Sequence, residues 1–242
     1  MHSHILPAVD DGSQSLSESI ELLTAMRLQG ITDVIATPHF YPLEDNIVDY
    51  KHRITDAYNV LVKESSGKGL PNIYLGSEVL YYRYIGSSES AYELCLNNSR
   101  YLLLELTDEC ICKEFFEDME NLYNKLGIIP IIAHLERYCH APNYKKLLKY
   151  IKNSAVLAQI NASSLFSQSR KTTEKLIKGG FVNFIATDAH SIIRRPPLMK
   201  QALAAISESL GSEYASGFIR NSQILLENIC GVTNEHSQFD IK

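Results

Sequence analysis

The chain has 242 residues, of which 45% are hydrophobic and 21% charged, and its formal net charge is −5. A chain of this length and composition can bury a sizeable core and is typical of a globular protein. It has no long apolar run and no basic segment followed by an apolar one at its start, so we expect no membrane span, no signal peptide and a cytoplasmic location. The acidic charge, with no basic run longer than a pair such as Arg194-Arg195, argues against a nucleic-acid-binding surface.

Short apolar segments alternate with longer helical patterns along the chain. The first helix is predicted from Ser15 to Gly30, where Ser15 and Glu18 match a capping box and Gly30 matches a stop signal. Further helices are predicted at 45–64, 88–96, 113–126, 144–153 and 165–178, with two more between 197 and 230. The seven predicted strands are HSHIL at the start, ITDVIATPH, NIYLGSEV, RYLLLEL, IIPIIAH, VLAQI and FVNFIATDAH.

Strands that alternate with helices predict right-handed βαβ crossovers and therefore a parallel sheet in an α/β fold. Seven such units favour a distorted TIM-like (βα)7 barrel, and an open doubly wound sheet is the alternative that the pattern leaves open. No repeat or linker divides the chain, so we expect a single domain over residues 1–242. The five cysteines lack the spacing of a zinc or redox pair, and we expect reduced, mostly buried thiols.

Side chains typical of metal ligands follow nearly every predicted strand. The carboxyl ends of parallel barrel strands converge on one face, so residues far apart in the sequence are expected to meet there. Taken singly, a histidine at a strand end is more often structural, and Asp-Asp-Gly is more often a turn. Their repetition at strand after strand favours a shared metal site. The candidate ligands are His2, His4, Asp11, His39, Glu78, Glu105, His134, Asp188 and His190.

Five imidazoles and four carboxylates without a thiolate suit manganese, iron(II), zinc or magnesium. Nine ligands exceed the needs of one ion, so two or three divalent ions are predicted. Close divalent ions lower the pKa of a bridging water and stabilise the entering and leaving oxygens of a displacement at phosphorus. Arg137 and Arg195 lie in loops leaving the same face, and they are the candidate catalytic residues because a guanidinium matches phosphate oxygens.

A cysteine nucleophile of the usual phosphatase kind is excluded by spacing. That chemistry needs an arginine six positions after the cysteine, next to a thiol of low pKa. The residues six positions after the five cysteines are Tyr101, Phe116, Asp118, Lys145 and His236.

The motifs together resemble one superfamily. HSHILPAVDDG, ATPH, GSEV, LLLEL, AHLERY, QIN and ATDAHSIIRRPP resemble, in order and over essentially the whole chain, the polymerase and histidinol phosphatase (PHP) superfamily. The branch they resemble most is the bacterial manganese-dependent protein-tyrosine phosphatases of the CpsB/YwqE type. The resemblance implies a distorted seven-stranded barrel, the PHP fold, with three metal ions, manganese first among them.

The same resemblance assigns roles position by position. It places the first ion on His2, His4, Glu78 and Asp188, the second on Glu78, Glu105 and His134, and the third on Asp11, His39 and His190. It assigns phosphate binding to Arg137 and Arg195. Arg194 is an extra neighbour whose role is open. In the family an acidic and a hydrophobic residue precede the first histidine, whereas here Met1 does, so we expect a short first strand and a missing outer partner for one imidazole.

The implied activity is hydrolysis of phosphotyrosine by a hydroxide that bridges the ions. The implied substrate is the tyrosine-rich tail of a bacterial tyrosine kinase that controls capsule or exopolysaccharide production, and members of the family can form oligomers. Two alternatives stay open: a histidinol-phosphate phosphatase or other small phosphomonoesterase on the same fold, and a scaffold that binds a kinase without catalysis. Retention of all nine ligands argues against the scaffold, and the acidic charge argues against an exonuclease.

Overall fold

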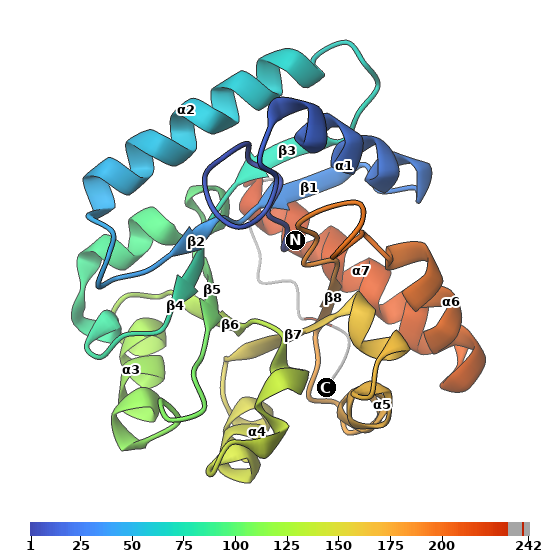
Figure 1. Ribbon diagram of the computed structural model, residues 1–242. Helices are drawn as coiled ribbons and strands as arrows, with labels where there is room; N and C mark the ends of the chain where they lie inside the picture. Colours follow the sequence, from blue (N-terminus) through green and yellow to red (C-terminus); the bar gives the residue numbers. More distant parts are fainter. Residues whose placement is uncertain (232–238, 240–242) are drawn as a thin grey trace.

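The structure, a computed structural model, describes residues 1–231 and 239, and its strands form a curled parallel half-barrel with helices outside (Figure 1). The strands are β1 (Asp33–Ala36), β2 (His39–Phe40), β3 (Asn72–Leu75), β4 (Glu78–Leu80), β5 (Tyr101–Glu105), β6 (Ile129–Ile132), β7 (Leu157–Asn161) and β8 (Phe184–Ala186). β1 pairs with β3, and the other six follow the order β2-β4-β5-β6-β7-β8 with every pairing parallel. The predicted parallel α/β architecture is confirmed.

The helices are α1 (Leu16–Leu28), α2 (Ile47–Ser65), α3 (Lys113–Asn124), α4 (Tyr144–Asn153), α5 (Arg170–Lys178), α6 (Met199–Ser209) and α7 (Ser212–Ile229). The segment predicted as a helix at 88–96 consists instead of short 3-10 turns, Glu89–Leu94 and Leu96–Asn98. At the start of α1 the Ser15 hydroxyl accepts a hydrogen bond from Glu18 N, as predicted. The Glu18 carboxylate completes the cap by accepting from Gln14 N at 2.7 Å. Among the described residues, no helix combines the length and the apolar character needed to cross a bilayer.

Two buried clusters cover the two faces of the sheet, as the strand period of two requires. The cluster between the sheet and the outer helices contains Val34, Leu102, Leu104, Ile132, Ala158 and Ile185. Their neighbours in the sequence pack on the concave side of the sheet: Ile35, Leu103, Ile131, Leu157 and Phe184. The strands are therefore mostly apolar on both faces.

Two predicted strands are each broken in the middle. ITDVIATPH becomes β1 and β2, and NIYLGSEV becomes β3 and β4, and the breaks lie in matching register because Ala36 pairs with Leu75 and His39 with Glu78. At the second break a Cβ on Gly76 would lie 2.6 Å from the Leu96 side chain, so a bulkier residue does not fit there. The paired bends turn His39 and Glu78 away from the first sheet.

The predicted first strand is wrong in form. HSHIL makes one isolated parallel bridge, between Ser3 and Ala189, and no regular strand. It is still hydrogen-bonded on both sides, since His4 N donates to Ala189 O at 2.9 Å and Thr37 N donates to Ser3 O at 2.9 Å. The chain then folds back on itself, and a Cβ on Gly12 would lie 2.2 Å from His4 O. This tight return leaves no room for a Cβ at position 12 and ends the extended segment.

The five cysteines are all free, but only Cys95 is fully buried and Cys230 is exposed, so the expectation of mostly buried thiols is wrong in part. Burial raises the pKa of the Cys95 thiol to about 12 and that of Cys110 to about 11. Such thiols are protonated at neutral pH and are poor nucleophiles.

Candidate metal centre

The nine predicted ligands lie together at the carboxyl ends of the strands. Six are buried (His2, His4, Glu78, His134, Asp188 and His190), and the exposed side-chain fractions of His39, Glu105 and Asp11 are 10%, 20% and 67%. Their ligand atoms form three groups that could each hold an ion: His4 with Asp11, His39 and His190; His2 with His4 and Asp188; and His39 with Glu78 and Glu105. Residues spread over almost the whole chain thus converge on one site.

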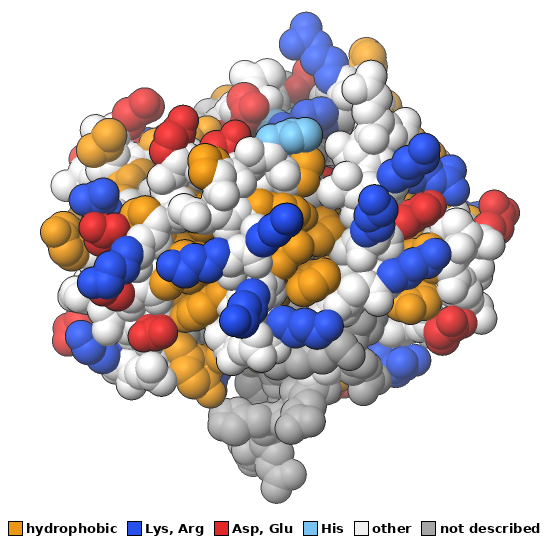
Figure 2. All heavy atoms as spheres, turned by 90° about the horizontal axis from the view of Figure 1, so that it is seen from below, with side chains coloured by type: hydrophobic (Ala, Val, Ile, Leu, Met, Phe, Trp, Pro, Cys, Tyr) orange, Lys and Arg blue, Asp and Glu red, His pale blue; other side chains and the backbone are white. Residues whose placement is uncertain are grey.

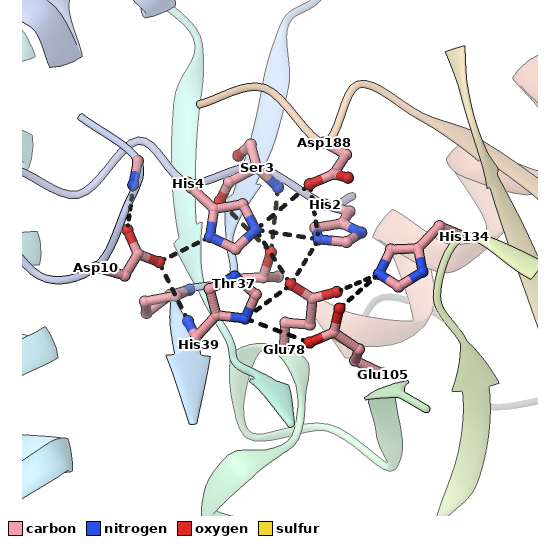
Figure 3. A network of polar contacts seen from close by, with 12 residues as sticks. His2, Ser3, His4, Asp10, Thr37, His39, Glu78, Glu105, His134 and Asp188 are labelled. Carbon is pink, nitrogen blue, oxygen red and sulfur yellow. Dashed lines mark hydrogen bonds and ion pairs between the residues drawn. The ribbon is translucent and has the colours of Figure 1, made fainter. Parts of the chain in front are cut away.

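The Glu78 carboxylate lies at the middle of this cluster (Figure 3). One oxygen, Oε2, lies 3.1 Å from His2 Nε2, 3.2 Å from His4 Nε2 and 3.2 Å from His39 Nδ1. The other oxygen lies 2.9 Å from His134 Nε2. A carboxylate that presents its two oxygens to separate sets of imidazoles has the arrangement of a ligand shared between ions.

Outer hydrogen bonds fix the orientation of four of the five imidazoles. The Nδ1 atoms of His2, His4, His134 and His190 lie 3.2, 2.7, 3.0 and 3.0 Å from Gln159 Oε1, Asp10 Oδ2, the Tyr138 hydroxyl and Asp188 O. Each Nδ1 is therefore occupied by a hydrogen bond, and each Nε2 points toward the cluster. Metal-binding histidines in proteins are held in this way.

Three features of the cluster fit divalent cations. His2 Nε2 and His4 Nε2 lie 3.2 Å apart, and two imidazole nitrogens so close need a proton or a cation between them. Asp188 Oδ1 and His39 Nδ1 are buried without a hydrogen-bond partner. Asp188 Oδ1 lies 3.4 Å from His2 Nε2 and 3.5 Å from His4 Nε2, so this unsatisfied oxygen faces the same point as the two close imidazole nitrogens. Cations satisfy such atoms where protein donors do not.

The two arginines converge on the other oxygen of Asp188. Arg137 Nη2 donates to Asp188 Oδ2 at 2.8 Å, and Arg195 Nη2 donates to the same atom. Arg195 Nη1 also lies 2.7 Å from His190 Nε2. The arginine side chains are 44% and 36% exposed. They form a cationic edge between the buried cluster and solvent, which is the position needed to meet a phosphate arriving from outside.

The charges of the cluster shift its pKa values in opposite directions. Burial would raise the pKa of the Glu78 carboxyl, but the neighbouring imidazoles, His2 first, hold it well below its usual value. Burial would lower the pKa of His134, but hydrogen bonds to Glu105 and Glu78 raise it to about 9. Burial and the nearby His4 and Arg195 charges lower the pKa of His190 to about 4. The Glu78 carboxylate thus stays ionised at neutral pH.

Two of the candidate ligands have strained backbones. His134 has φ 33° and Asp188 has φ 47°, both in the left-handed region that non-glycine residues rarely adopt. Each is the second residue after the end of a buried strand, β6 for His134 and β8 for Asp188. Strain of this kind costs of the order of 1 kcal/mol or more and is typical of functional sites.

Sequence reasoning missed the residues that position the ligands. Asp10 accepts hydrogen bonds from His4 Nδ1 and from His39 N at 3.2 Å, whereas its Asp-Asp-Gly context suggested only a turn. Gln159 Nε2 donates to Asn161 Oδ1 at 2.8 Å, and Asn161 Nδ2 donates to Asp188 Oδ2 at 2.6 Å. The signal was their alternation in β7, which puts both side chains on one face. The outer partner expected to be missing for the first histidine is supplied by Gln159.

A buried set of imidazoles and carboxylates at the carboxyl ends of parallel strands, edged by arginines, defines the class of metal-dependent phosphoesterases. The family model for capsular polysaccharide synthesis proteins, CpsB/CapC, matches residues 1–227. The chain belongs to this family.

Curated relatives cover nearly the whole chain. CapC of Staphylococcus aureus is 34% identical over 237 residues, covering 94% of this chain and 91% of that protein. The tyrosine-protein phosphatase YwqE of Bacillus subtilis is 30% identical, with 94% and 91% covered, and the tyrosine-protein phosphatase CpsB of Streptococcus agalactiae is 29% identical, with 94% and 98% covered.

A solved structure has the same fold. It comes from a crystallographic study of YwqE from Bacillus subtilis and CpsB from Streptococcus pneumoniae, described there as metal-dependent tyrosine phosphatases. The TM-score is 0.82 at 29% identity, with 94% of this chain and 93% of that chain covered. The family expected from the motifs is therefore confirmed.

Proposed function

We propose that this chain is a metal-dependent protein-tyrosine phosphatase. The observation that carries the proposal is the gathering of nine metal-type ligands at one site, together with two partly exposed arginines that both donate to one of these ligands, Asp188. The relatives named above as tyrosine-protein phosphatases support the choice of phosphotyrosine. The chain is proposed to act as a phosphoric monoester hydrolase on proteins.

The proposed cofactor is a set of three divalent ions, manganese first, with iron(II), zinc or magnesium as substitutes. His2, His4, Glu78 and Asp188 would hold one ion, Glu78, Glu105 and His134 the next, and Asp11, His39 and His190 the last. Each of these sets has internal contacts of 3.5 Å or less between ligand atoms, such as His2 Nε2 to Glu78 Oε2 at 3.1 Å, His134 Nε2 to Glu105 Oε1 at 3.3 Å and His190 Nε2 to Asp11 Oδ1 at 3.3 Å. Divalent ions supply Lewis acidity that activates water near neutral pH and offsets charge on phosphoryl oxygens.

The protein's own groups bind and orient the substrate. Arg137 and Arg195 reach out from loops on either side of Asp188 and would hold the non-bridging phosphate oxygens with forked N–H donors. Asp188, which also accepts a hydrogen bond from Asn161, positions these guanidinium groups before substrate arrives. A phenol, with pKa near 10, leaves more readily than an alkyl alcohol, so the reaction depends less on a general acid.

The rim of the site suits a protein substrate better than a small enclosed metabolite. Beside Arg195, the loop tip presents Ile193 with 90% of its surface exposed. Leu43 and Tyr84, which follow β2 and β4, are 100% and 71% exposed. Apolar side chains left in water at the mouth of a site can pack against residues flanking a phosphotyrosine. The proposed substrate is accordingly the tyrosine-rich tail of a bacterial tyrosine kinase in capsule synthesis, met in the cytoplasm.

Two structural proposals complete this assignment. The His2–His4 segment is hydrogen-bonded to Thr37 on one side and to Ala189 on the other, so we assign it as the element that closes a distorted (βα)7 barrel over a single domain, residues 1–242. Oligomer formation, as the family resemblance implies, belongs to the same proposal and is checked by light scattering.

The test is phosphate release by the purified protein with manganese. A phosphotyrosine peptide, a phosphoserine peptide and histidinol phosphate are compared, each with and without a chelator. We expect chelator-sensitive turnover of the phosphotyrosine peptide alone, with manganese content measured in the same samples. Preference for histidinol phosphate would keep the metal site and overturn the substrate, and metal binding without any turnover would favour the kinase-binding scaffold.

A further inference from the structure

The outer surface of α4 and α5 carries a concentration of lysines that the proposed reaction does not use. We call this surface the lysine face. Its exposed lysines are Lys145, Lys146, Lys149 and Lys152 on α4 and Lys171, Lys175 and Lys178 on α5. Figure 2 shows Lys and Arg side chains gathered around a hydrophobic patch on this side of the molecule, with acidic side chains toward the edges of the view. The end of α4 meets the end of α5 where Lys152 Nζ donates to Gly179 O at 3.1 Å.

The charge of the lysine face opposes that of the rest of the chain. The two helices contain seven lysines and one arginine against one glutamate, which gives +7. The whole chain carries −5, so everything outside these two helices sums to −12. Such segregation is not expected from a uniformly solvated acidic surface, where both signs intersperse.

The lysines of α4 form no ion pairs with the described acidic residues. α4 contains no acidic residue, and no salt bridge among the described residues involves its lysines. In α5 the one glutamate, Glu174, pairs with Arg170 at 2.9 Å rather than with a lysine. The positive charge is therefore available to a partner.

Apolar and aromatic groups lie between the lysines. Lys146 Nζ lies 4.4 Å from the centre of the Phe116 ring, and Lys152 Nζ lies 5.1 Å from that of Phe181. Leu148, Tyr150 and Phe181 are partly buried against the core, with their remaining surface among the charges. Lysine stems over apolar surface, with ammonium groups in water and an aromatic ring between them, are typical of surfaces that meet a lipid–water boundary.

We propose that the lysine face docks on an anionic membrane surface. Lysine supplies a compact, strongly hydrated charge that suits diffuse attraction, whereas specific recognition of single phosphates or carboxylates favours arginine, and the only arginine here is paired. The acidic remainder does not prevent docking, because charges more than a Debye length of about 8–10 Å away are screened at physiological salt. The proposal does not depend on the phosphatase assignment.

Docking by this face leaves the candidate active site open. α4 and α5 lie on the outer wall of the curled sheet (Figure 1), while the metal ligands lie at the carboxyl ends of its strands. A molecule held side-on would present its site along the membrane plane.

The test measures sedimentation of the full chain with vesicles of phosphatidylcholine, with and without phosphatidylglycerol, at increasing salt. The variant Lys145→Gln/Lys149→Gln removes two α4 charges that are exposed and lie outside the catalytic machinery. Each lysine near an anionic surface contributes about fivefold in affinity, so we expect about a thirtyfold loss. The matched control, Lys63→Gln/Lys68→Gln, removes the same charge near the end of α2 on the opposite side of the molecule and should bind like the parent.

The outcomes separate cleanly. Binding to anionic vesicles that falls with salt, and with the α4 variant but not the control, supports the proposal. No binding at low salt overturns it, as does an equal loss in both variants, which would reflect net charge alone. Absence of vesicle binding together with retention on a polyglutamate resin through Lys145 and Lys149 would overturn it in favour of an acidic protein partner. Unchanged circular dichroism in both variants shows that they fold.

Discussion

Replacing Asp10 with asparagine keeps the size of the side chain but leaves it one acceptor oxygen instead of two. In the structure, Asp10 Oδ2 accepts from His4 Nδ1 at 2.7 Å and from His39 N at 3.2 Å, and Oδ1 accepts from Gly12 N at 2.9 Å. Burial would raise the pKa of Asp10, but the hydrogen bond from His4 lowers it to about 2, so the carboxylate is ionised at neutral pH. The oxygen of an asparagine amide can accept from the donors on one side, either Gly12 N or His4 Nδ1 and His39 N. Its nitrogen then directs N–H groups at the donors on the other side.

Either orientation of the new amide weakens the metal site. With its oxygen toward His4, the amide nitrogen faces Gly12 N–H and the loop carrying Asp11 loses its anchor. With its nitrogen toward His4, the imidazole loses the acceptor that holds its Nδ1–H. A hydrogen bond to a charged group contributes about 1.5–3 kcal/mol, and outer partners of metal ligands typically change affinity by about 10–100-fold. We expect Asp10→Asn to weaken manganese binding about thirtyfold, or about 2 kcal/mol.

Calorimetric titration of the chelator-treated protein with manganese measures this directly. Asp56→Asn, at an exposed position of α2, is the matched control because it removes the same charge away from the site. Thermal unfolding of both variants without metal separates a folding defect from a binding defect. Manganese affinity within twofold of the parent, with intact fold, would refute the reasoning that Asp10 orients the imidazole.

Three further outcomes are expected. Arg195→Ala should lower kcat/KM for a phosphotyrosine peptide about a hundredfold at saturating manganese, because a forked charge-assisted contact is lost, while metal analysis at that concentration finds the same manganese per chain as in the parent. The pKa of His134 is raised to about 9, so its imidazole is protonated in the metal-free protein at pH 7. A metal ion binds only the neutral imidazole, so manganese affinity measured at pH 6, 7 and 8 should rise with pH. Metal binding should also release protons. Ile193→Ser should raise KM for peptide substrates about fivefold, because apolar contact is lost, and leave turnover of free phosphotyrosine unchanged; equal effects on both substrates would place Ile193 outside peptide binding.

The sequence predicted the nine-residue cluster better than it predicted the strands that carry it. Helix α4 has the predicted bounds, 144–153, because its lysines and apolar residues keep a period of 3.6 throughout. The two broken strands were predicted as continuous because both halves have the same β-branched, apolar pattern. The second break lies at Gly76, where a Cβ would lie 2.6 Å from the Leu96 side chain, twenty positions away, and no local pattern contains this proximity.

The outer partners of the ligands escaped prediction for a different reason. Gln159 and Asn161 belong to the QIN motif at the end of β7, and a polar side chain in that position is compatible with a metal ligand as much as with a partner of one. Their amides instead link His2 to Asp188 through a relay in which Gln159 Oε1 also accepts from His134 N at 2.9 Å. An amide can both donate and accept, so it suits a bridge between two ligands of unlike kind. The register in which β7 pairs with β8 determines which ligands the Gln159 and Asn161 amides reach.

Asp188 couples the metal cluster to the phosphate edge. Its Oδ1 faces His2 and His4 Nε2, and its Oδ2 faces Asn161 and the two arginines. Burial would raise the pKa of this carboxyl, but the neighbouring charges, that of His2 first, hold it far below its usual value. The left-handed backbone at φ 47° turns the side chain so that one oxygen can serve each set. A carboxylate can face cations on both sides because it is anionic and each of its two oxygens serves one set. A side chain with a single acceptor cannot do this. The contacts of the two oxygens thus offset the backbone strain.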